Sequence, residues 1–446
     1  MKKLSHLWSN PWSNPNKTES THRFFTLLIG LSIVLGIILR FLWASDMEYK
    51  QDEKYMFELT QKVGITEPWP LLGMPSGVGI RNPGLSQWIF IFITKIAHIT
   101  HPVSLVQTVI LFNSLALILL AFFIFRWIKK PEQESWIWGL ALISVNPVAI
   151  QLERKIWAQS ILPLFCVLFL ISWFNRNRKC GAFFWGLMGA LLGQIHMPGF
   201  YYAFGFFIWT LISSIQKKPY FDDFSKDHLK TQWKNWFFGS CLGLIPMLPW
   251  IQYLFANRPH YAHAAEWSRI LELRYYTFWA LEPLGVQISH SLGIAAFKSY
   301  IRYPIIFGFP TYAVGIAHLI LIILGLYLLF SFIKKVWIKI KDRKKIFSIA
   351  TSQTSLAIRS LLLGMGPLMT AGKVFVHRHY LIVTYPLQYV WLAQVTFSSV
   401  NLSRARKILI FIWCLELLIS FEFLHYIHLT GGTLGEYGTA FSRQNQ

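Results

Sequence analysis

The chain has 446 residues, of which 54% are hydrophobic and only 14% are charged. Soluble domains carry about 25% charged residues, so this composition excludes an ordinary soluble protein. The formal net charge of +22 suggests nucleic acid at first, but Lys and Arg fall mainly in short segments between apolar stretches. That distribution follows the positive-inside rule of membrane proteins and argues against nucleic acid as a partner.

Apolar blocks long enough to cross a bilayer follow a polar leader, residues 1–22, which is rich in Pro and Asn and is predicted to be cytoplasmic and non-helical. No small-residue cleavage site follows the first block, so it is a retained helix rather than a signal peptide. The eleven predicted transmembrane helices are 24–43, 105–127, 135–151, 156–174, 181–197, 199–215, 236–256, 312–333, 355–373, 380–398 and 407–426. We therefore predict an all-α polytopic membrane protein with one transmembrane domain, residues 23–430, and an outer carboxyl-terminal tail, residues 431–446.

The segment from Ser86 to Ile99 is also apolar enough to insert. Counting it as a span would move every later loop to the other side and reverse the charge bias, so we expect an interfacial or re-entrant helix. Two long loops, about 44–104 and 257–311, then lie on the outer side, while most of the short basic loops lie inside.

The first outer loop holds the leading catalytic candidates. When residues 48–63 are projected as a helix, Asp52 falls inside an apolar stripe beside Met56. A carboxylate aimed at the membrane or the protein body is costly unless something pairs with it, so Asp52 is either functional or part of a structural ion pair. Glu53 lies at the edge of the stripe, and Asp46, where the first helix leaves the membrane, is the second candidate for the base.

Positive charges at the outer helix ends are candidate ligands for a phosphate. Arg154 and Lys155 stand on the disfavoured side, which indicates a phosphate or acidic partner unless they snorkel at the interface. His196, at the outer end of the fifth span, is suited to bind phosphate or shuttle a proton, and equally to a structural role. Arg378, two residues before Tyr380 in a strongly cationic loop, is suited to bind phosphate oxygens in a bidentate manner.

Two outer segments leave alternatives open. Gly73 to Gly84 is too rich in Gly and Pro for a helix, and is either a turn-rich connection or a backbone site for an anion. The second long loop is rich in aromatic residues, which suit either an acceptor sugar or a membrane-interface belt. Its candidate residues are Tyr261, His263, Glu266, Trp267, Tyr275, Tyr276 and Trp279.

Together these positions resemble the GT-C superfamily of membrane glycosyltransferases, and most of all the family 39 type, which includes protein O-mannosyltransferases and aminoarabinose transferases. The resemblance spans about residues 24–400. The similar positions are Asp52-Glu53 with Tyr55, Asn82-Pro83, Asn146-Pro147, Arg154-Lys155, and Arg378 and Tyr380 with Pro386 downstream. The chain departs from the family pattern at Gly84, where a second proline is usual, and at the added His379.

The resemblance implies a GT-C-like glycosyltransferase that moves a sugar from a polyprenyl-phosphate donor to an extracytoplasmic lipid, glycan or protein, with inversion. It implies Asp52 and Glu53 as the catalytic carboxylates, with Asp52 as the base. It implies, as ligands of the donor and its phosphate, Arg154, Lys155, Arg378, Tyr380, His196 and Tyr55. The expected setting is a bacterial inner membrane with the site facing outward, without a metal or cofactor.

Two other functions remain open. A transporter or flippase for a polyprenyl-linked glycan should bury charges or break helices at mid-membrane, whereas the strong charges here, apart from Glu416 and Glu422, cluster at one surface. A polymerase or ligase that uses a diphosphate-linked glycan would share the basic outer loops, but its activity should not require the Asp52 carboxylate.

Overall fold

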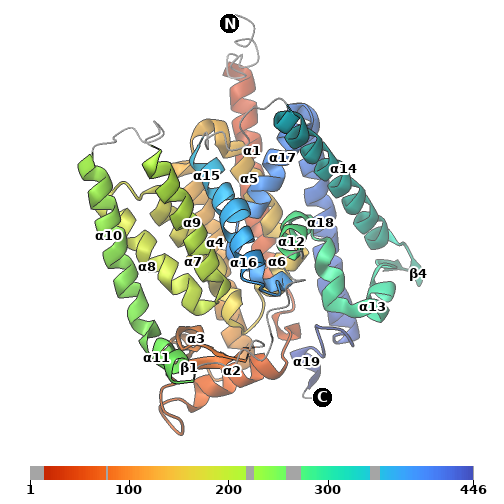
Figure 1. The fold of residues 1–446 in the computed structure, drawn as a ribbon. Helices are drawn as coiled ribbons and strands as arrows, with labels where there is room; N and C mark the ends of the chain where they lie inside the picture. Colours follow the sequence, from red (N-terminus) through yellow and green to blue (C-terminus); the bar gives the residue numbers. More distant parts are fainter. Residues whose placement is uncertain (1–14, 77–78, 217–225, 258–272, 342–351, 445–446) are drawn as a thin grey trace, which may run out of the picture.

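Long apolar helices dominate this computed structural model, which describes residues 15–76, 79–216, 226–257, 273–341 and 352–444 (Figure 1). Six helical segments in these residues are long and apolar enough to cross a bilayer. They lie in α1 (Pro15–Phe41), α4 (Pro102–Trp127), α9 (Pro198–Ile215), α10 continued by α11 (Lys226–Leu244 and Leu248–Ala256), α14 (Ala313–Lys341) and α18 (Leu402–Thr430). This is the pattern of a membrane-embedded helical protein.

The outward faces of these helices are apolar. On α1 a helical stripe of Leu27, Leu31, Val34 and Ile38 is exposed, each side chain to at least half of its surface. Water would disfavour such a stripe, whereas lipid solvates it, and the helix satisfies its own backbone polar groups. α1 begins at Pro15, inside the predicted non-helical leader, because proline is well tolerated in the first turn of a helix. Residues 1–14 of that leader lie outside the described part of the chain.

The other five predicted spans contain helices that are shorter or broken. They correspond to α5 and α6 (Lys130–Val145 and Pro147–Leu152), η3 and α7 (Ala158–Ile161 and Leu162–Phe174), α8 (Lys179–Ile195), α15, η8 and α16 (Gln353–Arg359, Ser360–Met365 and Gly366–Ala371), and η9 and α17 (Arg378–Thr384 and Leu387–Ser399). α5 is the centre of the bundle, since every residue from Ser135 to Val145 is buried and α1, α4, α17 and α18 pack around it.

The break between α5 and α6 is held by Asn146. Its side-chain oxygen accepts hydrogen bonds from the amides of Val148 and Ala149, at 3.0 and 3.1 Å, and so caps α6. Its side-chain nitrogen donates to the Glu416 carboxylate at 2.8 Å and to the Glu282 carbonyl at 3.0 Å. The buried acid that the sequence singles out in α18 therefore has a structural partner.

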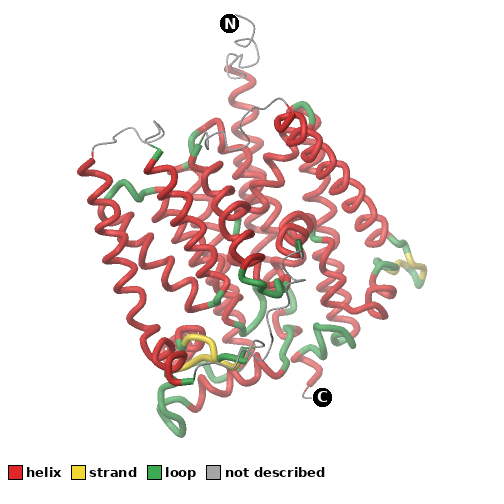
Figure 2. Tube along the Cα trace, in the orientation of Figure 1, coloured by secondary structure: helices red, strands yellow, loops and turns green. Residues whose placement is uncertain are grey.

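The two ends of the bundle differ (Figures 1 and 2). The starts of α1 and α10 and the end of α14, which flank basic segments, lie at one end. The other end carries α2 (Gln51–Lys62), α3 (Leu85–Ile96) and the carboxyl terminus. The short helix α3, in the segment predicted to be interfacial, packs against α2 and α8 at this second end.

Smaller elements complete the fold. They are η2 (Ala44–Asp46), β1 and β2 (Leu72–Pro75 and Arg81–Pro83), η4 (Ile245–Met247), α12 (Arg274–Leu281), η6 and η7 (Glu282–Leu284 and Val286–Ile288), α13 (Ser289–Tyr300), β3 and β4 (Ile305–Ile306 and Phe309–Pro310) and α19 (Phe441–Gln444). β1 and β2 pair in antiparallel fashion, with Leu72 opposite Pro83. The Gly-rich segment 73–84 is thus largely a two-stranded hairpin.

Candidate functional site

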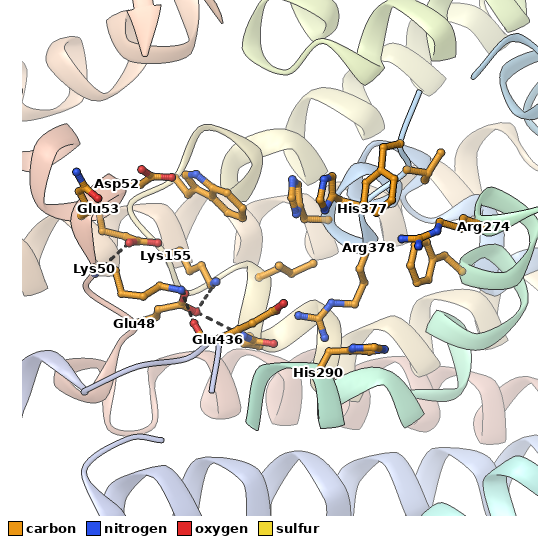
Figure 3. Close-up of a pocket in the computed structure, with 18 residues that line it drawn as sticks. Glu48, Lys50, Asp52, Glu53, Lys155, Arg274, His290, His377, Arg378 and Glu436 are labelled. Atoms are coloured by element: carbon orange, nitrogen blue, oxygen red, sulfur yellow. Dashed lines mark hydrogen bonds and ion pairs between the residues drawn. The ribbon is translucent and has the colours of Figure 1, made fainter. Parts of the chain in front are cut away.

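A cavity of about 650 Å³ lies between segments that are distant in the sequence (Figure 3). Its wall includes the start of α2, the chain after α6, α12, α13, the loop before η9 and the carboxyl-terminal tail. The titratable residues of the wall are Glu48, Lys50, Asp52, Glu53, Lys155, Arg274, His290, His377, Arg378, His379 and Glu436. Four residues that the sequence predicts as site residues therefore meet here: Asp52, Glu53, Lys155 and Arg378.

The two neighbouring carboxylates of α2 have different environments. Asp52 is exposed to the cavity, and within the described residues its side chain forms no ion pair or hydrogen bond. Glu53 is 2% exposed, and its carboxylate accepts a hydrogen bond from the Lys50 amide at 3.0 Å. Burial raises the pKa of Glu53 above its usual range, with Glu48 adding to the effect and Lys155 opposing it.

The predicted burial of Asp52 in the apolar stripe is wrong. The helix begins at Gln51, so residues 48–50, which were included in the projection, do not share its periodicity. The buried face of α2 follows Glu53, Met56 and Thr60. Since successive residues of a helix differ by about 100°, the buried carboxylate is Glu53, and Asp52 turns toward the cavity.

Lys155 belongs to a small ion-pair network in the wall. Its ammonium pairs with the Glu48 carboxylate, which also pairs with Lys50 at 2.5 Å. The Lys155 nitrogen lies 5.1 Å from the centre of the Trp157 ring, whose edge also forms part of the wall. One carboxylate thus serves two ammonium groups, and the network retains positive charge toward the cavity.

Arg154, predicted to hold a phosphate, has a structural role in the fold. Arg154 is buried and is absent from the wall of the cavity. Its guanidinium donates to the backbone oxygens of Leu39 and Trp43, at 3.2 and 2.7 Å. The last carbonyls of a helix lack internal partners, so Arg154 is used to hold the end of α1.

Arg378, the first residue of η9, faces the cavity. Its guanidinium donates to the Gln287 carbonyl at 2.7 Å and to the Ser291 hydroxyl at 2.8 Å, while Ser291 donates to Gln151 at 2.5 Å. Burial lowers the pKa of Arg378, and Glu282 and other acids oppose this, so the guanidinium stays charged. Among the described residues no carboxylate lies within ion-pair distance, which leaves its charge for a ligand.

Three further predicted donor ligands lie outside the wall of the cavity: His196, Tyr380 and Tyr55. His196 is buried, and its Nε2 atom has no hydrogen-bond partner among the described residues. Its ring packs 5.3 Å from that of Tyr380 and 5.9 Å from that of His379. His196 and Tyr380 therefore pack against the His379 ring, which lines the cavity. Tyr55 is exposed on α2.

Asp46, the second candidate for the base, is also outside the wall. Its carboxylate is bonded by His428 at 2.6 Å and by the Ser442 hydroxyl at 2.5 Å. These contacts dock the carboxyl-terminal tail, which brings Glu436 into the wall. Sequence reasoning missed Glu436, since its only signal is an acid next to Gly435 in a short tail.

The aromatic residues of the second long outer loop divide into two groups. Tyr261, His263, Glu266 and Trp267 lie outside the described residues. Tyr275 and Trp279 are buried, and the hydroxyls of Tyr275 and Tyr276 donate to the carbonyls of Leu361 and Leu362. Tyr275 and Tyr276 thus hold α12 against η8, and the Trp279 ring lies 6.1 Å from the Trp391 ring of α17, so all three side chains have structural contacts.

In the ranges that the structure describes, no group of three or more His, Cys, Asp or Glu side chains is arranged to hold a metal ion. The wall instead offers isolated carboxylates, ammonium and guanidinium groups, and imidazoles. Such a set suits proton transfer and the binding of an anion. When the chain is compared with protein-family models, curated proteins and solved structures, nothing matches it.

Proposed function

We propose that this chain is an integral membrane glycosyltransferase that transfers a sugar from a polyprenyl-phosphate donor to an extracytoplasmic lipid, glycan or protein. One observation carries the proposal: Asp52, a carboxylate without a side-chain partner in the described residues, shares a cavity with the cations Lys155 and Arg378. A base and an anion site in one cavity are what transfer from a phosphate leaving group requires.

The proposed reaction uses these residues in separate roles. Asp52 accepts the proton of the acceptor hydroxyl as its oxygen attacks the anomeric carbon. The bond from that carbon to the phosphate oxygen breaks on the opposite face, which inverts the configuration. The electron pair leaves with the lipid phosphate, whose negative charge grows by one. Lys155 and Arg378 stabilise that growing charge.

The sidedness of the bundle supports an outward-facing site in a bacterial inner membrane. The cavity lies at the end that carries α2 and the tail, whereas the helix ends next to basic segments lie at the other end. Basic segments remain on the cytoplasmic side during insertion. The donor lipid then reaches the cavity from the outer leaflet.

The alternative of a transporter or flippase rests on the helix break at Asn146-Pro147, since broken helices form binding sites in transporters. Here, however, the polar groups at the break bond to one another, with Asn146 bound to Glu416. Asp52 and Arg378, which form no ion pair in the described residues, lie in the cavity at one end of the bundle, which favours an enzyme.

The test compares strains by mass spectrometry of envelope glycolipids, glycans and glycoproteins. A deletion strain should lack one sugar, wild-type chain should restore it, and the Asp52→Asn variant should not. Glu58→Gln, which changes an exposed acid of the same helix, is the matched control and should restore the sugar. Restoration by Asp52→Asn would contradict the proposed base, and an unchanged set of sugars in the deletion strain would contradict the function.

A further inference from the structure

The carboxyl-terminal tail, Gly431–Gln444, is part of the site. On one side the amide of Phe441 donates to the Met47 carbonyl at 3.1 Å, and the Tyr437 hydroxyl donates to the Asp46 carbonyl at 2.5 Å. On the other side the Tyr437 amide donates to the Ser291 carbonyl at 2.9 Å. The tail thus joins the start of the first outer loop to α13 across the cavity.

Close packing of the tail positions Glu436. A Cβ atom on Gly435 would lie 2.3 Å from the Leu292 carbonyl oxygen, so only glycine allows this approach to α13. The next residue, Glu436, enters the wall of the cavity between the Glu48–Lys155 pair and Arg378 (Figure 3). Lys50 holds its backbone through a hydrogen bond to the Glu436 carbonyl.

The Glu436 carboxylate is close enough to influence the cations around it. Burial lowers the pKa of Arg378, and Glu436 opposes that shift together with other acids. Burial also lowers the pKa of Lys50, but Glu48, Glu53 and Glu436 more than compensate, so it is raised overall. Yet in the described part of the chain the Glu436 side chain forms no ion pair, so its charge is directed at whatever fills the cavity.

The charges of the wall are nearly balanced. Four cations face four acids: Lys50, Lys155, Arg274 and Arg378 against Glu48, Asp52, Glu53 and Glu436. Because the acids match the cations in number, the wall has no surplus of positive charge for a second negative charge, and the cavity suits a ligand that carries a single negative charge.

We propose that Glu436 determines the charge of the phosphate that this cavity accepts, so that a singly charged phosphodiester is preferred to a doubly charged phosphomonoester. The inference rests on the proposed function, in which the donor is a phosphodiester and the product is a phosphomonoester. The same carboxylate then promotes release of the product, because repulsion increases when the bond to the sugar breaks.

Coulomb's law gives this proposal a distinctive signature. The interaction of a fixed charge with a ligand is proportional to the ligand's charge. If removal of Glu436 tightens binding of a singly charged ligand about fivefold, it should tighten binding of a doubly charged ligand at the same place by the square, about 25-fold. A loss of packing or shape would not follow the ligand's charge.

The experiment uses the full chain in nanodiscs of neutral lipid at pH 8, with farnesyl methyl phosphate and farnesyl phosphate as probes. The monoester has its second pKa near 6 and is doubly charged at this pH. Calorimetry should show that wild-type chain prefers the diester. Glu436→Gln should tighten binding of the diester about fivefold and binding of the monoester about 25-fold. Glu436→Asp should keep the wild-type preference, and the control Glu58→Gln should leave both affinities unchanged.

The outcomes separate this inference from the proposed function. Equal effects of Glu436→Gln on both probes, or weaker binding of the diester, would overturn the role of Glu436. Arg378→Ala provides the reference for the phosphate site. If Arg378→Ala weakens binding of both probes while Glu436→Gln leaves the ratio of the two affinities unchanged, only the inference about Glu436 fails. If wild-type chain and Arg378→Ala bind both probes equally, the phosphate site itself fails.

Discussion

Two neighbouring charge networks in this protein behave differently. Glu153 and Arg154 belong to a closed network, in which Glu153 pairs with Arg40 at 2.6 Å and Arg154 bonds to carbonyls at the end of α1. Lys155, the next residue, belongs to an open network in the cavity wall, where it shares the Glu48 carboxylate with Lys50. Three consecutive charged residues thus divide between structure and site.

The difference teaches that the number of internal partners distinguishes a structural cation from a candidate ligand site. Groups of the closed network are buried and bonded to the chain, so their loss should lower stability. Groups of the open network face a cavity, where two ammonium groups share one carboxylate, so their loss should lower binding or transfer. The two kinds of loss can be measured separately.

The largest expected effect is that of Asp52→Asn in the open network. Because the amide cannot accept the acceptor's proton, transfer should fall by about 10²–10⁴-fold. The melting temperature should stay at the wild-type value, because Asp52 is exposed. Transfer assays with the purified chain measure the loss, and Glu53→Gln is the neighbouring control that should keep most activity. The reverse result would exchange the roles of the two carboxylates.

Arg40→Ala tests the closed network. It leaves the Glu153 carboxylate buried without its partner, which should cost about 3–5 kcal/mol of folding free energy. Thermal unfolding in detergent, with the yield of inserted protein, measures the loss. The double variant Arg40→Met/Glu153→Leu removes both charges and should recover most of the stability. If the double variant is as unstable as Arg40→Ala, the loss of stability does not come from the unpaired Glu153 charge, and this explanation is wrong.

Lys155→Ala and Arg154→Ala give the sharpest contrast, since the two residues are adjacent. Lys155→Ala should lower kcat/KM about 100-fold with little change in melting temperature, because Lys50 still pairs with Glu48. Arg154→Ala should lower stability by about 1–3 kcal/mol through its unpaired carbonyls, with activity per folded molecule retained. If both variants lose activity at wild-type stability, the division between the networks is wrong.

The last expected effect concerns stability alone and is a pH dependence due to Glu282, a buried acid near Arg378. Burial raises the pKa of Glu282 to about 8 from its usual value of 4.5, against the opposing effects of Arg378 and Gln388. Between these values the folded chain keeps a proton that the unfolded chain loses, so stability should fall as pH rises from about 4.5 to about 8. Melting temperatures at several pH values should show this slope in wild-type chain, a flatter slope in Glu282→Gln, and the wild-type slope in Glu58→Gln.

The sequence predicted much of the site because charge is rare in an apolar chain. Asp52 and Glu53 stand out in the helical projection of the first outer loop, Lys155 and Arg378 stand out as cations at outer helix ends, and all four line the cavity. Arg154 stands out equally, yet it turns away to carbonyls more than 100 residues earlier in the chain. Sidedness identifies the surface on which a charge lies, but not its partner.

The limits of periodicity explain the remaining errors. The orientation of Asp52 depended on where α2 begins, and a shift of the helix start changes which residues share its buried face. Hydropathy alone predicts continuous spans over 135–151 and 380–398. In the structure the helices break at Asn146-Pro147 and at Pro386, so the helical segments are shorter. Glu436 reached the cavity through contacts of the tail that have no local signal.

By itself the sequence determined that this chain is an apolar helical membrane protein, with its basic segments and its candidate site residues at opposite ends. Those properties follow from transfer of side chains between water and lipid, which acts on each segment separately. Only the tertiary structure decided which of two adjacent charges faces the cavity, and that the tail completes the wall. Both outcomes depend on hydrogen bonds between residues far apart in the sequence. Arg154 donates to a carbonyl at the end of α1, and the Tyr437 hydroxyl donates to the Asp46 carbonyl.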